Sequence, residues 1–149
     1  MPIEPDQIFL RPALPSDVDF VVEVTEAAMR AYAEQTFGTW DNAIPRARFD
    51  PASCAIIRVS GKDVGCMDVV YCEDHLQLNV LYLLPSVHNQ GIGSAVLRRL
   101  IAEADAARKP IRLRVLRVNP AQRFYQRNGF VVTDSNNEKF FMERPYKNE

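Results

Sequence analysis

The segment from Leu81 to Ser94 limits the possible folds of this chain more than any other stretch of its sequence. An apolar run ends at Pro85, a polar turn follows, and Gly91 and Gly93 open a stretch with helical spacing of apolar residues. The residues on that stripe are Ile92, Val96, Leu97, Leu100, Ile101 and Ala104. The first N–H groups of a helix lack partners and carry partial positive charge, and glycine lets an anion approach the main chain closely. The sequence therefore predicts a strand–turn–helix junction that binds pyrophosphate or a similar anion.

Two familiar phosphate-binding turns do not fit this junction. A dinucleotide-binding turn needs a third small residue three positions after Gly93, where Val96 stands, and no regular βαβ unit surrounds it. A nucleotide P-loop needs a lysine followed by serine or threonine, and Ser94 followed by Ala95 does not supply it. A tight turn that binds no ligand remains the alternative.

Hydrophobic patterning orders the remaining elements along the chain. Strands are expected at Ile8–Pro12, 55–59, 64–71, 76–84, 111–115, 130–133 and 140–143. Helices are expected from an N-cap at 16–17 to about Tyr32, over 43–49, from about Gly91 to 109, and from an N-cap at Asn119 to 128, with an irregular stretch over 34–41. This order predicts a mixed sheet with helices packed on it.

Length and charge exclude several classes of protein. At 149 residues the chain fits one domain, 1–149, and can bury a core without disulfide or metal staples. A net charge of −1 is unlike that of nucleic-acid-binding proteins, and Arg112 and Arg114 alternate with apolar residues like the solvated face of a strand. The acidic, proline-interrupted start does not resemble a signal peptide, and the longest apolar run, 80–84, is too short to cross a bilayer. Neither nucleic acid nor a membrane is expected as a partner.

The cysteines and histidines predict neither a disulfide framework nor a metal site. Cys54, Cys66 and Cys72 are odd in number and form no C-x-x-C pair. His75 and His88 have no partner at ligand spacing. A reducing cytoplasm is therefore the expected compartment.

Two motifs in this order resemble the GCN5-related N-acetyltransferase (GNAT) family. His88, Gly91 and Gly93 occupy the places of the family's Arg/Gln-x-x-Gly-x-Gly/Ala turn at a strand–helix junction. The stretch 114–130, which contains Asn119 and Tyr125, resembles its Asn-x-x-Ala-x-x-x-Tyr-x-x-x-Gly-Phe signature. The resemblance implies an α/β fold of the α+β type: a mixed, largely antiparallel sheet of about seven strands, helices on both faces, and a splayed central strand pair.

The resemblance also implies the ligand and its contacts. Acetyl-CoA would be the acyl donor, with its pyrophosphate on the turn and its pantetheine arm along the strand before it. Asn119 would approach the pantetheine or the thioester. The residues implied for coenzyme binding are Leu81, Tyr82, Leu83, His88, Asn89, Gln90, Gly91, Ile92, Gly93, Ser94 and Asn119. His88 replaces the family's arginine or glutamine, so it either contacts phosphate or is an exposed turn residue. Asn119 stands one residue nearer the tyrosine than the common spacing.

The implied reaction is the attack of a neutral amine on the acetyl thioester. A main-chain N–H near Leu83 would stabilise the oxyanion. Tyr125 would act as the acid that protonates the departing thiolate, and its alternative is an aromatic side chain packed on the sheet. No base is assigned: relatives often place a carboxylate on the strand before the turn, but 77–80 holds none, which leaves Glu26, Glu34, Glu73, Asp74, His75 or solvent.

The acceptor pocket of the family lies after the first helix. Tyr32, Glu34 and Trp40, with Phe37 and Asp41, lie there in this sequence and would suit a cationic amine; the edge of a core with solvated charges is the alternative. The expected function is N-acetyl transfer to a primary amine of a small molecule or peptide, without a metal. A non-catalytic acyl-CoA-binding module is the second hypothesis, and a homodimer is left open.

Overall fold

The computed structural model describes residues 3–148 of the chain. Its strands are β1 (Ile8–Pro12), β2 (Cys54–Val59), β3 (Lys62–Tyr71), β4 (Leu76–Leu83), β5 (Ile111–Leu116), β6 (Val131–Ser135) and β7 (Lys139–Arg144). Its α-helices are α1 (Val18–Phe37), α2 (Ala43–Arg48), α3 (Ile92–Ala107) and α4 (Ala121–Arg127). Three short 3-10 helices, η1 (Pro5–Gln7), η2 (Pro15–Asp17) and η3 (Pro85–Val87), lie in the connections.

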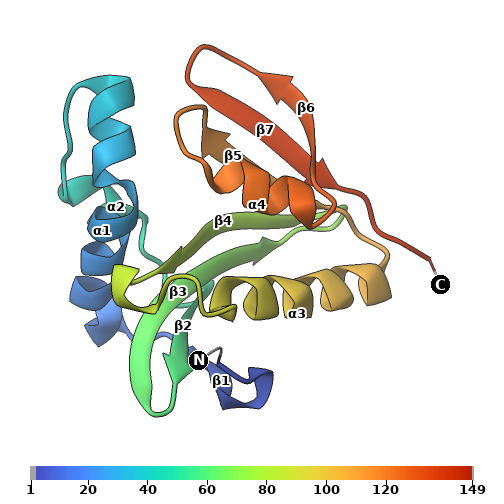
Figure 1. The fold of residues 1–149 in the computed structure, drawn as a ribbon, viewed down its shortest axis with the longest axis horizontal. Helices are drawn as coiled ribbons and strands as arrows, with labels where there is room; N and C mark the ends of the chain where they lie inside the picture. The colour runs from blue at the N-terminus through green and yellow to red at the C-terminus, as the bar shows by residue number, and fades with distance from the viewer. Residues whose placement is uncertain (1–2, 149) are drawn as a thin grey trace.

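All seven strands form one sheet in the order β1-β2-β3-β4-β5-β7-β6. Only the central pair, β4 and β5, is parallel; the other neighbours are antiparallel. Figure 1 shows these two central strands diverging, so that the sheet opens toward the end of β4. The expected mixed, largely antiparallel seven-stranded sheet is confirmed.

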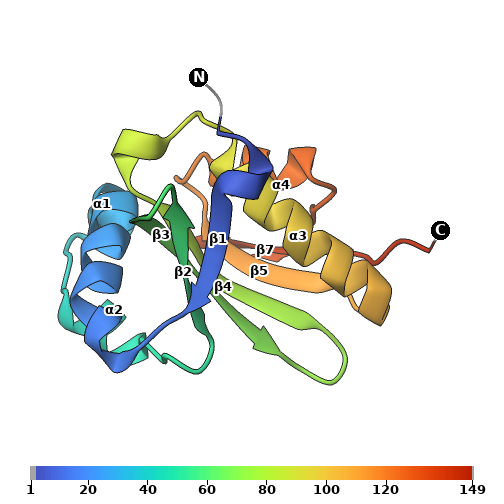
Figure 2. The same ribbon diagram turned by 90° about the horizontal axis from the view of Figure 1, so that it is seen from below.

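Helices cover both faces of the sheet (Figure 2). The larger core lies under α3 and α4, where Val96, Leu100 and Phe130 are buried against apolar residues from most of the strands. A smaller core lies under α1, where Val24 packs with Ile56 and other residues of β2 and β3. Alternate residues of the central strands therefore point into different cores, as the period of two in a strand requires.

A β-bulge in β4 redirects this strand. Leu76, Leu78, Leu81 and Leu83 are all buried in, or packed against, the core under α3, although their spacing changes from two to three residues. The register between β3 and β4 shifts at this point, and Asn79 is the extra residue. A bulge bends its strand and increases the local twist. The bulge therefore keeps one row of leucines on the core while β4 turns away from β5.

The two splayed strands, β4 and β5, are paired over only a short stretch. β4 and β5 pair only through Leu76 with Ile111 and Gln77 with Arg112, at the start of each strand. Beyond these residues the two strands part. The expected splay is confirmed, and the bulge at Asn79 is its physical cause.

The first helix is longer than expected. The stretch 34–41 was expected to be irregular after a helix ending near Tyr32, but α1 continues to Phe37. Gly38 then ends it in the left-handed conformation (φ 82°), and its N–H donates to the carbonyl of Glu34 at 2.8 Å. Glycine adopts this conformation without a steric cost, so Gly38 was the stop signal in the sequence.

The expected cap of α1 is also wrong in detail. Asp17 occupies the N-cap position, but its side chain makes no capping hydrogen bond. Its carboxylate accepts hydrogen bonds from Arg11 (2.9 Å) and from the main chain of Leu14 (2.7 Å). These bonds hold β1 to the start of α1 and lower the pKa of Asp17.

Asp105 on α3 forms hydrogen bonds that hold the end of β7 against this helix. It accepts hydrogen bonds from the guanidinium of the buried Arg144 (2.8 Å) and from the main chain of Lys147 (2.9 Å). The bond from Arg144 is the main reason that the pKa of Asp105 lies below its usual value. Because this pKa is depressed, the pair stabilises the fold above the unfolded pKa of about 3.9, and this contribution is lost as the pH falls through the folded pKa.

We expect Asp105→Asn to lower the free energy of unfolding at pH 7 by about 2 kcal/mol, because Arg144 would stay buried without its counter-charge. Urea denaturation at pH 7 and pH 3 measures this. The difference from the wild type should shrink at pH 3. Asp19→Asn removes a carboxylate from the exposed pair with Arg46 and should leave the melting temperature unchanged. An equal loss at both pH values would contradict the assignment.

Candidate active site

The opening beside β4 exposes main-chain groups of two residues. The N–H of Leu84 donates to Val64 on β3 at 2.8 Å. Main-chain groups alternate along a strand, so those of Tyr82 also face β3, and those of Leu81 and Leu83 face the opening. No strand of the described residues pairs with them there. The opening thus presents an unpaired strand edge that an extended ligand can join.

The turn after β4 presents a run of unused donors. From 89 to 94, no main-chain N–H has a hydrogen-bond acceptor among residues 3–148; the first helical bond is from Ala95 to Gly91, at 3.0 Å. Asn89 and Gly91 are both left-handed, with φ of 63° and 79°. Successive N–H groups at a helix start, next to left-handed residues, form an anion-binding concavity.

The side chain of His88 lies against the end of β4. Its Nε2 lies 3.0 Å from the carbonyl oxygen of Leu83, to which it donates. The main-chain N–H of His88 is bonded to Pro85 at 3.2 Å. His88 is therefore an exposed residue of the turn. Its side chain satisfies the carbonyl of Leu83, and the N–H of Leu83 still faces the opening.

Tyr125 lies under the sheet opening, on α4. It is 9% exposed, and its ring makes edge contacts with Phe124 and Phe130 at centroid distances of 5.2 and 5.4 Å. Burial raises the pKa of Tyr125 well above its usual 10, with a smaller contribution from Tyr82. The phenol is therefore protonated at neutral pH and is within electrostatic reach of the Tyr82 phenol.

Asn119 joins three parts of the site. Its Oδ1 accepts the N–H of Ala121, the first residue of α4, at 2.9 Å, although the N-cap position belongs to Pro120 and not, as expected, to Asn119. Its Nδ2 lies 3.6 Å from the sulfur of Met29 on α1. This contact places the second half of α1 next to the connection between β5 and α4. Helix α1 therefore borders the opening on the face of the sheet opposite α3 and α4.

The sequence of this region matches a known family. The family model described as Acetyltransferase (GNAT) domain matches residues 50–132, which is more than half of the chain. The matched part contains the splayed strands, the turn and α4. The chain belongs to the GNAT acetyltransferase family.

Solved structures share the fold of this GNAT domain. The PaiA N-acetyltransferase from Thermoplasma acidophilum, in complex with coenzyme A, is 20% identical with a TM-score of 0.76, covering 93% of this chain and 99% of that one. Ard1 from Thermoplasma volcanium is 20% identical (TM-score 0.73, 95% and 99% covered). The ribosomal-protein-S18-alanine N-acetyltransferase from Escherichia coli is 17% identical (0.71, 95% and 96%). No curated protein sequence matches the chain.

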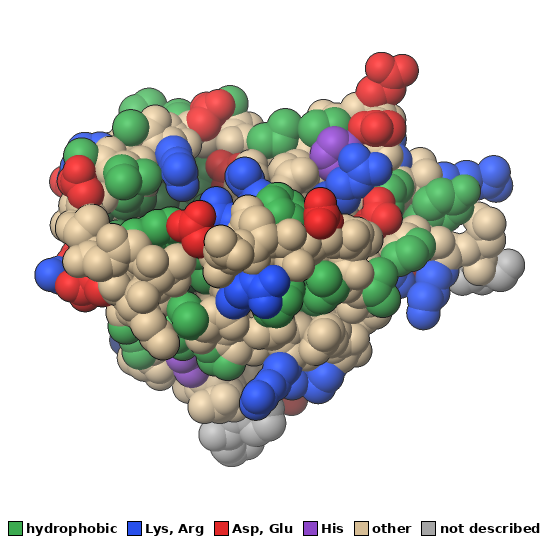
Figure 3. Space-filling model, turned by 90° about the horizontal axis from the view of Figure 1, so that it is seen from above, with side chains coloured by type: hydrophobic (Ala, Val, Ile, Leu, Met, Phe, Trp, Pro, Cys, Tyr) green, Lys and Arg blue, Asp and Glu red, His purple; other side chains and the backbone are tan. Residues whose placement is uncertain are grey.

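The residues expected around the acceptor gather at one end of α1. Tyr32 and Glu34 lie on the helix itself, and Glu34 forms an ion pair with Arg30 at 3.3 Å. Trp40, in the connection to α2, donates from Nε1 to Asn42. Figure 3 shows the surface of the GNAT domain hollowed beside this part of the molecule, with Lys or Arg and Asp or Glu side chains on the walls.

Most of the carboxylates considered as bases are already paired. Glu26 accepts from Arg30 (2.7 Å), and Asp74 pairs with His75 (2.7 Å) at the turn before β4. The sequence did not point to Asp68, which lies on β3 opposite Val80, next to the bulge. Its carboxylate accepts from Ser53 (2.7 Å) and from Asn79 (3.3 Å), and it faces the α1 side of the sheet, as its register partner Cys54 does. Only the leucine spacing in β4, which reveals the bulge, could have drawn attention to it.

Within residues 3–148, no group of three His, Cys, Asp or Glu side chains is arranged to hold a metal. The same residues contain no helix with the length and apolar character that a membrane span needs. One hollow of about 480 Å³ lies over β2 and β3, away from the turn. A second, of about 600 Å³, lies where β4 and β5 part.

Proposed function

We propose that this GNAT domain, residues 1–149, transfers an acetyl group from acetyl-CoA to a primary amine of a small molecule or peptide, by direct attack of the amine. The observation that carries the proposal is the run of unused main-chain donors at 89–94, placed at the end of an unpaired strand edge. A donor array beside an extended edge suits a ligand with a diphosphate and an amide-containing arm. The PaiA neighbour, crystallised with coenzyme A, supports this choice of ligand.

The chain offers acetyl-CoA a continuous surface. The amides of Asn89, Gln90, Gly91, Ile92, Gly93 and Ser94 would hold the diphosphate. The main-chain groups of Leu81 and Leu83 would pair with the pantetheine arm, and Tyr82 would line it with its side chain. His88 would keep the end of β4 in place through its bond to Leu83 rather than contact phosphate. Asn119, on the far side of the opening, would border the thioester.

In the proposed reaction, the amine nitrogen attacks the thioester carbon, the carbon–sulfur bond breaks, and coenzyme A leaves as a thiol. The N–H of Leu83 faces the opening and would donate to the oxyanion. Tyr125 would donate its proton to sulfur; because burial disfavours its phenolate, the tyrosine would then take a new proton from solvent without delay. Asp68, beside the bulge, would accept the proton of the amine through water.

The end of α1 would form one wall of the acceptor site. Tyr32 and Trp40 would supply aromatic surface, and Glu34 would attract the ammonium form of the amine before it loses its proton. The contact between Met29 and Asn119 supports this, because it brings α1 up to the opening.

The proposed compartment is the cytoplasm. Cys54, Cys66 and Cys72 are free thiols. Burial raises the pKa of Cys54 to about 12 and that of Cys66 further, so both remain protonated and unreactive.

Ser94→Asp should change stability and coenzyme binding in opposite directions. Ser94 is the third residue of α3, where a carboxylate stabilises the positive helix end by about 0.3–1 kcal/mol. The same charge would repel the diphosphate, so we expect the Kd for acetyl-CoA to rise at least about tenfold. Calorimetry and thermal unfolding measure the two effects.

Ser94→Ala is the matched control, because it removes the hydroxyl but adds no charge. It should bind acetyl-CoA nearly as the wild type does, and high salt should reduce the defect of the aspartate variant. If Ser94→Asp binds acetyl-CoA normally, the diphosphate is not held at this turn.

The function itself is tested by measuring thiol release from acetyl-CoA with a panel of primary amines and peptides. Release that depends on the amine, with the acetylated amine identified by mass spectrometry, is the expected result. Tight binding of acetyl-CoA without turnover of any amine would favour an acyl-CoA-binding module instead.

A further inference from the structure

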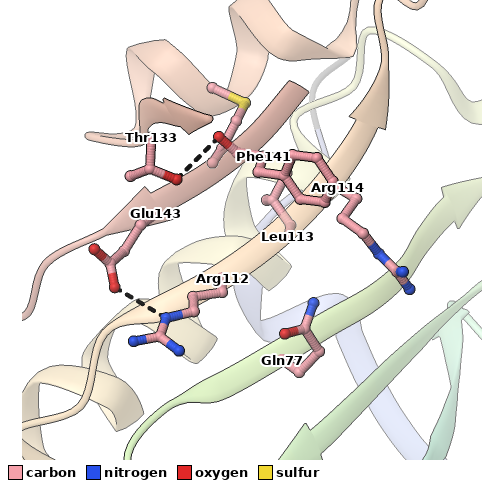
Figure 4. Close-up of a pocket in the computed structure, with 8 residues that line it drawn as sticks. Gln77, Arg112, Leu113, Arg114, Thr133, Phe141 and Glu143 are labelled. Carbon is pink, nitrogen blue, oxygen red and sulfur yellow. Dashed lines mark hydrogen bonds and ion pairs between the residues drawn. The ribbon is translucent and has the colours of Figure 1, made fainter. Parts of the chain in front are cut away.

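A hollow of about 600 Å³ begins at the point where the two central strands part. Its lining residues are Gln77, Arg112, Leu113, Arg114, Thr133, Phe141, Met142 and Glu143. Gln77 and Arg112 are the last paired residues of β4 and β5, so the hollow adjoins the opening. Figure 4 shows that Arg114 extends from β5 across this space toward β4.

The hollow lies on the face of the sheet opposite α3. Leu113 and Met142 belong to the core under α3, whereas Arg112 and Arg114 alternate with core residues along β5 and are exposed. An acceptor in this hollow would thus approach the strands from the side opposite Tyr125, which lies in the α3 core.

The polar groups of the hollow are mainly donors. Arg114 has no carboxylate within ion-pair distance among residues 3–148. Arg112 uses its Nε for Glu143 at 3.1 Å, which leaves its terminal nitrogens. Gln77 turns its amide oxygen toward His75, whose Nε2 lies 3.2 Å away, and its amide nitrogen toward the hollow (Figure 4). The hollow thus holds two guanidinium groups and an amide N–H but only the carboxylate of Glu143, so its net charge is positive.

The hollow also has one apolar side chain. The ring of the half-buried Phe141 lies on the same face as Arg114, whereas Leu113 and Met142 point into the core under α3 and line the hollow with main-chain atoms. The hydroxyl of Thr133 donates to the carbonyl of Phe141 at 3.2 Å. A space of this volume holds an organic molecule with an aliphatic body, not only an inorganic anion.

We propose that the acceptor amine carries a carboxylate, and that Arg114 binds this carboxylate in the hollow where β4 and β5 part. The inference rests on the proposed function and adds the chemical class of the acceptor. The guanidinium of Arg114 matches a carboxylate in bidentate geometry. The ring of Phe141, the register partner of Arg114, packs against the chain between the carboxylate and the amine, which directs the amine into the opening.

The test compares 4-aminobutyrate with 4-aminobutanamide, which differ in the charged end, as acceptors for the wild type, Arg114→Gln and Lys62→Gln. Lys62 lies at the start of β3, outside the hollow, so its variant removes one positive charge elsewhere. We expect the wild type to have a higher kcat/KM for the carboxylate. Arg114→Gln should lose about tenfold for the carboxylate through KM and less than about twofold for the amide, because a charge-assisted hydrogen bond is lost only with the former.

Binding of the reaction product gives a second measurement that does not need turnover. Wild-type protein should bind N-acetyl-4-aminobutyrate more tightly than its amide in a calorimetric titration, and Arg114→Gln should abolish that difference. Equal kcat/KM for the two amines, or equal losses in Arg114→Gln and Lys62→Gln, would overturn the inference while transfer to amines stands. If neither amine is acetylated, the product titration decides: equal binding of acid and amide overturns the inference.

Discussion

Tyr125→Phe is expected to lower kcat by about 10²- to 10⁴-fold, the usual contribution of a general acid. The phenylalanine ring can keep the edge contacts with Phe124 and Phe130, so the packing around α4 should persist. No partner for the Tyr125 hydroxyl exists among residues 3–148, so its loss leaves no buried group unsatisfied. Steady-state kinetics, together with calorimetry of acetyl-CoA binding, measure this effect.

The control for this variant is Tyr146→Phe, which removes an exposed phenol near the C-terminus. It should leave kcat, acetyl-CoA binding and the melting temperature unchanged. Tyr125→Phe should also retain its melting temperature and its affinity for acetyl-CoA. Normal turnover by Tyr125→Phe would remove the acid from the proposed mechanism, and weakened binding would assign Tyr125 a packing role.

Gly65→Ala is expected to lower the free energy of unfolding by about 3 kcal/mol, at the upper end of what overpacking costs. A Cβ on Gly65 would lie 2.3 Å from the carbonyl oxygen of Tyr82 and 2.7 Å from a methyl carbon of Leu83. The carbonyl belongs to the main chain and cannot turn aside, so β4 must move away from β3. We expect the melting temperature to fall by about 6–12 °C.

The same variant should weaken acetyl-CoA binding by about tenfold, because the displacement falls on the part of β4 that faces the opening. Gly93→Ala is the matched control: its Cβ would meet Leu83 and Phe124 at 3.7 and 3.8 Å, which are ordinary contacts. We expect this control, which tests stability alone, to be more stable by about 0.5 kcal/mol, since alanine favours a helix. If Gly65→Ala is as stable as the wild type, β3 and β4 do not pack as closely at Gly65 as the structure indicates.

Helices and strands whose apolar residues recur at a regular spacing were predicted well from the sequence. The alternation of Ile111 with Arg112 gave the buried and exposed faces of β5, and the stripe after Gly91 gave α3. The end of α1 was predicted too early because the polar residues near Glu34 suggested a loop. The residue that stops the helix is Gly38, one position beyond its last turn.

The candidate site was predicted unevenly for a similar reason. The glycines and Tyr125 stand in local motifs, so their positions could be read from neighbouring residues. Asp68 and Arg114 carry no motif: strand register alone places Asp68 beside the bulge, and the parting of β4 and β5 places Arg114 at the hollow. His88 was left with two interpretations, because its contact with Leu83 depends on how the turn folds back.

By itself, the sequence determined the order of strands and helices, the anion-binding junction and the resemblance to the GNAT family, because these depend on residues close together in the chain. The tertiary structure decided where β4 leaves β5, which main-chain groups remain unpaired and which charged side chains line the hollow where the strands part. Those properties depend on strand register and on contacts between distant segments. One bulged residue, Asn79, changes them all without changing the local pattern on either side.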